Sequence, residues 1–200
     1  MPGLLNLAPE MKSSFVHKIT TNLKESRISW QLALAFIPIA FATYLFHELG
    51  HWTLGELTGN TMTICLNNSG PRNGVFNNDS AALWSSIGGP LFTILQAALF
   101  LMITRFTRSI YAWSVGFFAV FSRTFSLVFG GLDLQDEAHI ASMLQVSKYL
   151  VAGIVLIILF LLLWNSTRLM KLKNKALWYF LVLGVVAVLL VIGTNSMLYK

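Results

Sequence analysis

The sequence predicts an all-α integral membrane protein, and three observations support this class. First, 56% of the 200 residues are hydrophobic and only 11% are charged, whereas soluble domains carry about 25% charged residues. Second, the mean hydropathy is +0.67. Third, uncharged stretches recur at the length of about 20 residues that a helix needs to cross a bilayer. Barrel strands are only about 10 residues long and alternate in polarity, so we expect the spans to be helices.

Five spans are expected from these uncharged stretches. The first begins at residue 28 and runs into a polar motif near residue 47. The third is SIYAWSVGFFAVFSRTFSLVFGG, residues 109–131, which contains one arginine. The other three are uncharged throughout, and they cover residues 80–104, 149–167 and 176–199. The chain is therefore divided into a polar N-terminal segment, residues 1–29, and a multi-pass membrane domain, residues 30–200.

The placement of the basic residues predicts the orientation in the membrane. Ten of the 14 lie before the first span, between the second and third spans, or between the fourth and fifth. These three segments share one side of a five-span protein, and basic loops mark the cytoplasmic side. We expect a cytoplasmic N-terminus, an uncleaved first span, and insertion into the plasma (inner) membrane. The positive charge is then a feature of topology in a lipid bilayer, and no nucleic-acid partner is expected.

Two segments outside the spans are expected to carry local structure. Residues 58–80 are rich in Asn, Gly and Ser, and within them TMTICL, residues 61–66, has the composition of a short strand. Residues 131–147 contain the expected start of a short helix. Cys65 is the single cysteine, which excludes an intrachain disulfide and a zinc site built on cysteines.

The motif HELGH, residues 47–51, carries the chemistry of the sequence. On a helix, His47 and His51 project from the same face about 6 Å apart along the axis. This spacing allows two imidazoles to bind one Zn²⁺, with Glu48 beside the metal-bound water as general base. The metal would lower the pKa of that water, the nucleophile, toward about 7. Ionisable residues inside a membrane span are costly and therefore indicate function.

The segment FHELGH, residues 46–51, resembles the motif of the site-2-protease-like intramembrane zinc metalloproteases. The resemblance implies a core of three membrane helices, the third of which brings an aspartate as the last protein ligand. It also implies a Gly-Pro element in the middle helix. SSIGGPLFTILQA supplies this element as Gly88, Gly89 and Pro90, and Gly89 and Pro90 are expected to position the substrate. Thr93 stands where the family often has an asparagine.

The aspartate is expected from GGLDLQDEAHIASML, residues 130–144, where two carboxylates compete. Asp133 follows Leu132 as in the family's Leu-Asp-Gly, but Leu134 replaces the glycine. Asp133 also fits an N-cap of the following helix, which favours Asp136 as the zinc ligand and leaves Asp133 as the alternative. Since the first and third spans run in the same direction, HELGH, the Gly-Pro element and this segment should meet at one membrane face, the non-cytoplasmic one.

Arg123 lies inside the third span, where an unpaired arginine costs about 2.5–3.5 kcal/mol on insertion scales. We expect a carboxylate partner among Glu48, Asp133, Asp136 and Glu137, and a role in positioning the substrate. The alternative is that Arg123 extends to the outer interface.

These observations predict a membrane-embedded zinc metalloendopeptidase of the HExxH type. Its expected substrate is a membrane-associated protein or peptide, cleaved in or near the bilayer (intramembrane proteolysis). One alternative is a non-proteolytic metal-binding protein, either a pseudoprotease or a partner-binding protein. Another is a small ion transporter. The intact Glu48 favours the enzyme, because a protein that only binds metal does not need the base. The single ionisable cluster, at one face, disfavours a transporter, whose sites lie near the midplane.

Overall fold

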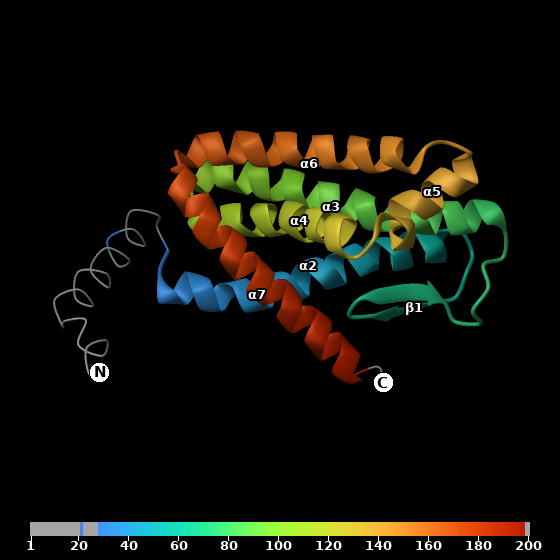
Figure 1. Ribbon diagram of the computed structural model, residues 1–200. Helices are drawn as coiled ribbons and strands as arrows, with labels where there is room; N and C mark the ends of the chain where they lie inside the picture. The colour runs from blue at the N-terminus through green and yellow to red at the C-terminus, as the bar shows by residue number, and fades with distance from the viewer. Residues whose placement is uncertain (1–20, 22–27, 199–200) are drawn as a thin grey trace, which may run out of the picture.

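The computed structural model describes residue 21 and residues 28–198 (Figure 1), so most of the predicted N-terminal segment, residues 1–29, lies outside the described residues. The described chain contains five helices that are long and apolar enough to cross a membrane, which confirms the five expected spans. They are α2 (Trp30–Leu57), α3 (Asp79–Thr107), α4 (Ile110–Phe129), α6 (Lys148–Met170) and α7 (Asn174–Leu198).

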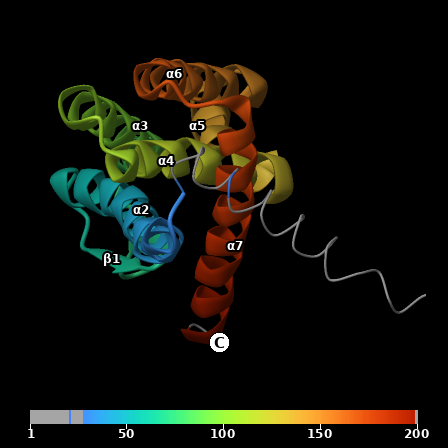
Figure 2. The same ribbon diagram turned by 90° about the vertical axis from the view of Figure 1, so that its left-hand side faces the viewer.

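The helices alternate in direction, so the segments that carry the polar motifs meet at one end of the bundle (Figure 1). Helices α2 and α4 end there, α3 begins there, and the short helix α5 (Asp136–Leu144) covers the same end. We call this the site end. Helix α6 packs on α3 and α4, whereas α7 crosses α2 and α4 obliquely (Figures 1 and 2). The convergence expected from the topology of the sequence is therefore present.

A β-hairpin follows α2 at the site end. Strand β1 (Met62–Cys65) pairs antiparallel with β2 (Asn68–Pro71). The Glu56 carboxylate fastens the hairpin to α2, because its Oε1 accepts a hydrogen bond of 2.7 Å from the Met62 amide. The strand expected within residues 61–66 is confirmed. Its partner was not expected, since the sequence Asn-Ser-Gly-Pro contains none of the β-branched or aromatic residues typical of strands.

The segment of residues 130–144, from which the aspartate ligand is expected, begins differently from the expectation. Gly131 has a positive φ of 84° and leads into a 3₁₀ turn, η1 (Leu132–Leu134), before α5 begins. The residue at the N-cap position of α5 is Gln135, so the prediction that Asp133 caps this helix is wrong. Asp133 instead forms an ion pair with Lys148 at the start of α6. Asp136 and Glu137 lie in the first turn of α5, where the helix dipole favours negative charge.

Helices α2 and α3 cross in close contact because both carry glycine at the crossing. A β-carbon on Gly50 would overlap the carbonyl oxygen of Gly88, and a β-carbon on Gly88 would overlap that of Gly50. Small residues allow such close backbone approach between membrane helices. Pro90 follows in the interior of α3 and does not open the helix. The backbone contact places the Gly-Pro element directly against the HELGH turn of α2.

The apolar core fills the opposite half of the bundle. Aromatic rings from α2, α4 and α7 pack against one another there: Phe36, Trp113, Phe117, Phe118 and Phe180. All five side chains are buried. This aromatic cluster joins α2, α4 and α7 away from the site end.

The close crossing predicts that Gly50→Ala destabilises the protein. The added methyl group meets backbone rather than a movable side chain, and overpacking of this kind costs about 1–3 kcal/mol. The matched control is Gly153→Ala in α6, where a β-carbon would meet no atom within 4 Å. Thermal unfolding in detergent should show a lower Tm for Gly50→Ala only. Equal Tm values for both variants would contradict the close crossing.

Candidate metal centre

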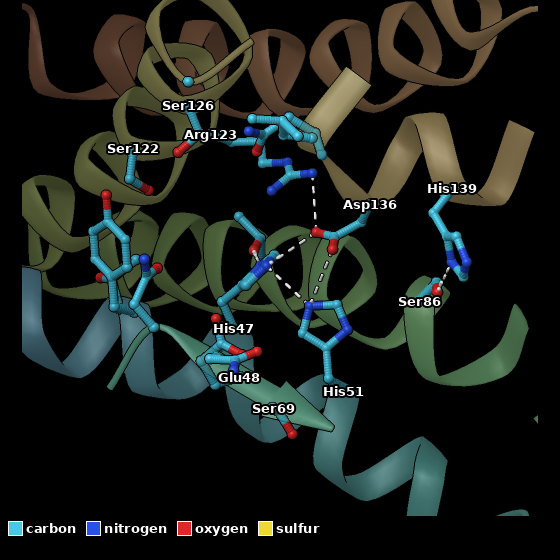
Figure 3. Close-up of a pocket in the computed structure, with 18 of the residues that line it drawn as sticks. His47, Glu48, His51, Ser69, Ser86, Ser122, Arg123, Ser126, Asp136 and His139 are labelled. Carbon is cyan, nitrogen blue, oxygen red and sulfur yellow. Dashed lines mark hydrogen bonds and ion pairs between the residues drawn. The ribbon is translucent and has the colours of Figure 1, made fainter. Parts of the chain in front are cut away.

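Three potential metal ligands converge at the site end (Figure 3). His47 and His51 project from α2, and Asp136 reaches them from the first turn of α5. The two His Nε2 atoms are 3.2 Å apart. Asp136 Oδ2 lies 3.2 Å from His47 Nε2, and Asp136 Oδ1 lies 3.5 Å from His51 Nε2. One ligand atom from each residue thus faces the same point.

The hydrogen bonds of the imidazoles fix which nitrogen faces that point. His51 Nδ1 lies 2.8 Å from the Ser85 carbonyl oxygen, which only accepts, so Nδ1 carries the hydrogen. Thr93 donates its hydroxyl hydrogen to the Gly89 carbonyl at 3.0 Å. Its oxygen therefore accepts from His47 Nδ1 at 2.9 Å. In neutral histidine the other nitrogen then has a free lone pair, so both Nε2 atoms are available as ligands.

The distances between the ligand atoms fit a tetrahedral ion. Ligands about 2.1 Å from a zinc ion at tetrahedral angles are separated by about 3.4 Å. The contacts of 3.2, 3.2 and 3.5 Å observed here, of which the last two involve different oxygens of Asp136, are of this size. Three groups with lone pairs at such separations repel each other unless a metal ion lies between them or an imidazole Nε2 is protonated. The residues therefore fit a divalent metal ion, and the three ligands found among the described residues leave one tetrahedral position open, as in catalytic zinc sites.

Asp136 is held in its charged form. Burial acts to raise the pKa of this carboxyl, but hydrogen bonds from His47 and His51, donated when their Nε2 atoms are protonated, and the charge of Arg123 hold the pKa well below the usual range. Arg123 Nη2 lies 3.0 Å from Asp136 Oδ2. The carboxylate is thus shared between the histidines on one side and a guanidinium on the other.

Arg123 has the carboxylate partners that the sequence suggested. It is buried in α4, and its Nε donates a hydrogen bond of 2.7 Å to Glu137 Oε1 while Nη2 pairs with Glu137 Oε2. The guanidinium is therefore engaged by Asp136 and Glu137 rather than extended to the interface. Arg123 also lines the cavity beside the three ligands, so its role in positioning the substrate stays a prediction.

The predicted base lines the same cavity as the ligands. Glu48 is only 5% exposed, and its carboxylate accepts no side-chain hydrogen bond within the part of the chain that the structure describes. The cavity has a volume of about 600 Å³ and includes Thr43, Ser122 and Ser126 from α2 and α4. A buried carboxylate without a fixed partner, beside three ligands in a polar cavity, is free to exchange a proton with water.

Gly89 leaves room for the imidazoles. A β-carbon there would overlap His51 Nε2 and His47 Cε1. Pro90 is buried next to it. The structure therefore gives Gly89 a steric role at the candidate metal centre, and the role of Gly89 and Pro90 in positioning the substrate stays a prediction.

Asp133 and His139 remain outside the cluster. Asp133 is exposed and pairs with Lys148. His139 is exposed and makes a hydrogen bond of 2.7 Å with Ser86 at the rim of the cavity (Figure 3). The sequence reasoning missed the partners of the two imidazoles. Thr93 is four residues after Gly89 and on the same face of α3, which was an available indication, but a backbone acceptor such as the Ser85 carbonyl leaves no pattern in the sequence.

Comparisons with protein-family models, curated proteins and solved structures give no match to this chain. The geometry of the site is therefore the basis for the proposed function.

The geometry predicts different outcomes for the two aspartates. Asp136→Asn removes an anionic ligand and should strongly reduce zinc binding, whereas Asp133→Asn breaks only an exposed ion pair and should leave it unchanged. Elemental analysis of the purified variants measures zinc per chain. Zinc loss in Asp133→Asn with retention in Asp136→Asn would contradict the cluster.

Proposed function

We propose that the chain is an intramembrane zinc metalloendopeptidase of the site-2-protease-like kind. The observation that carries this proposal is the convergence of His47, His51 and Asp136 beside the buried Glu48. Two imidazoles and one carboxylate form a ligand set typical of catalytic zinc. The zinc ion would supply a Lewis acid that lowers the pKa of water toward about 7.

Residues of the protein have three further roles: holding the ion, orienting its ligands and transferring a proton. His47, His51 and Asp136 hold the ion, and Thr93 and the Ser85 carbonyl orient the two imidazoles. Glu48 takes a proton from water at its carboxylate and can return it to the leaving amine. Such transfer by a positioned side chain contributes about 10²–10⁴ to the rate.

The hairpin supports an extended peptide as substrate. Asn68 and Ser69 of β2 line the cavity that holds the ligands. In the described residues the sheet has two strands, so one edge of β2 is unpaired. Extended peptides bind proteins by adding to such an edge. A peptide strand beside β2 would pass close to Glu48 and the ligands, an arrangement with no evident purpose in a protein that only stores metal.

We infer that the site end faces the extracytoplasmic side of a plasma (inner) membrane. Arg105 and Arg168 lie in the last turns of α3 and α6, at the end of the bundle opposite the site (Figure 1). Lys171 and Lys173 follow in the connection to α7. Basic loops are retained in the cytoplasm, which supports a cytoplasmic N-terminus and a metal centre on the other side.

The proposed mechanism predicts that Glu48→Gln abolishes proteolysis but retains zinc. Glutamine keeps the shape of the side chain but cannot accept the proton, so cleavage should fall by about 10² or more. The assay reconstitutes the purified chain with model single-span membrane proteins and identifies the products by mass spectrometry. His47→Ala is the companion variant and should lose both metal and cleavage.

The outcomes of this assay separate the alternatives. A wild-type chain that binds zinc but cleaves none of the model proteins would favour the non-proteolytic metal-binding protein. Undiminished cleavage by Glu48→Gln would show that another residue is the base. Zinc loss in Glu48→Gln would make Glu48 a ligand.

The proposed orientation predicts which positions react from outside the cell. Asn73→Cys lies in the exposed loop after the hairpin, and Lys175→Cys lies at the exposed start of α7. In a Cys65→Ser background, a membrane-impermeant thiol reagent should label Asn73→Cys in intact cells and Lys175→Cys only after lysis. The reverse pattern would place the site end in the cytoplasm.

A further inference from the structure

We propose that the buried ion pair between Arg123 and Glu137 is a positioning device that sets the metal affinity and ligand geometry of Asp136. This inference rests on the proposed metal centre but not on proteolysis. It concerns Arg123, which lines the cavity, and Glu137, which is fully buried behind it.

The pair has the geometry of a fixed clamp rather than a loose contact. Arg123 contacts Glu137 through both Nε and Nη2. The side chain of Arg123 is 6% exposed and that of Glu137 is 0% exposed. A two-point contact between a planar guanidinium and a carboxylate restricts both groups in direction as well as distance, and burial protects the pair from competition by water.

The clamp reaches the metal ligand directly. The Nη2 atom that pairs with Glu137 also lies 3.0 Å from Asp136 Oδ2. Asp136 and Glu137 are consecutive residues in the first turn of α5, so Arg123 holds two neighbouring carboxylates from one guanidinium. Partners that hydrogen-bond a ligand from behind fix its orientation and typically change metal affinity 10–100-fold when removed.

Glu137 also limits how strongly Arg123 competes for Asp136. If Asp136 were its only carboxylate partner, Arg123 would make a two-point contact with that residue. Such a contact would oppose the binding of a metal ion. Glu137 occupies Nε and shares Nη2, which leaves Asp136 with a single contact. The pair therefore orients the Asp136 carboxylate and still leaves it able to bind a metal ion.

The packing of α5 does not depend on this pair alone. Ile140 and Ala141 of α5 are buried, and α5 packs against both α3 and α6. A second ion pair, between Asp133 and Lys148, ties the preceding turn to α6. This second pair also joins the segment that carries Asp136 to the bundle, but it is exposed and does not contact Asp136. It therefore serves as a matched control.

The experiment measures zinc affinity by competition with a chromophoric chelator, and ligand geometry by the absorption spectrum of the Co²⁺-substituted protein. The double variant Arg123→Gln/Glu137→Gln removes both charges of the buried pair together, so the net charge of the cluster is unchanged. We expect it to retain the helical fold, to bind zinc 10–100-fold more weakly, and to show an altered Co²⁺ spectrum. The control Asp133→Asn/Lys148→Gln should match wild type in both measurements.

A second variant keeps the test decisive if the double variant fails to fold. Arg123→Lys retains the positive charge but presents a single ammonium group that cannot span both carboxylates. A positioning role predicts weaker zinc binding and an altered Co²⁺ spectrum in Arg123→Lys, whereas a role limited to charge compensation predicts wild-type values.

Three results would overturn the inference. They are wild-type zinc affinity and spectrum in the folded double variant, wild-type values in Arg123→Lys, or an equal loss in the control. A wild-type chain that binds no zinc would overturn the metal centre itself, whereas a chain that binds zinc without cleaving peptides would leave the positioning role intact.

Discussion

One interaction dominates the candidate site: the repulsion among three groups whose lone pairs point at each other inside a membrane protein. His47 Nε2, His51 Nε2 and the Asp136 carboxylate lie 3.2–3.5 Å apart. Unpaired polar groups in such surroundings are costly, and these three cannot satisfy one another when both imidazoles are neutral, because each offers only electrons. Thr93 and the Ser85 carbonyl accept from Nδ1, so that in the neutral imidazoles the lone pairs lie on the Nε2 atoms. A cation between the three donors resolves the conflict.

The close packing of α2 on α3 makes this arrangement possible. Gly50 and Gly88 bring the two backbones into contact, and Gly89 leaves the volume that the imidazoles occupy. The Ser85 hydroxyl donates to the His51 carbonyl at 3.1 Å while the Ser85 carbonyl accepts from the His51 ring. The glycines that look like packing elements in the sequence are therefore conditions for the chemistry, since a wider crossing would move both acceptors out of reach.

Local composition and helical spacing explain what could be predicted from the sequence. Hydropathy identifies the five spans because a bilayer requires about 20 apolar residues in each, and HELGH defines its own geometry because His47 and His51 share one helix. The choice between Asp133 and Asp136 could be weighed but not decided. It depends on the 3₁₀ turn after Gly131 and on Arg123, which reaches the segment from another helix. Contacts between helices of this kind have no local pattern.

The charges of the site connect metal binding to protonation. The cluster contains three carboxylates, from Glu48, Asp136 and Glu137, and one guanidinium, from Arg123. With all three carboxylates ionised, these groups carry a net charge of −2, which one divalent ion brings to zero. A buried net charge is expensive in a low-dielectric environment, so without the ion the cluster lowers its charge by taking up protons. Binding of a divalent metal ion would release those protons. In the proposed mechanism, a site that is neutral with its ion leaves Glu48 ionised, the form in which it would act as a base.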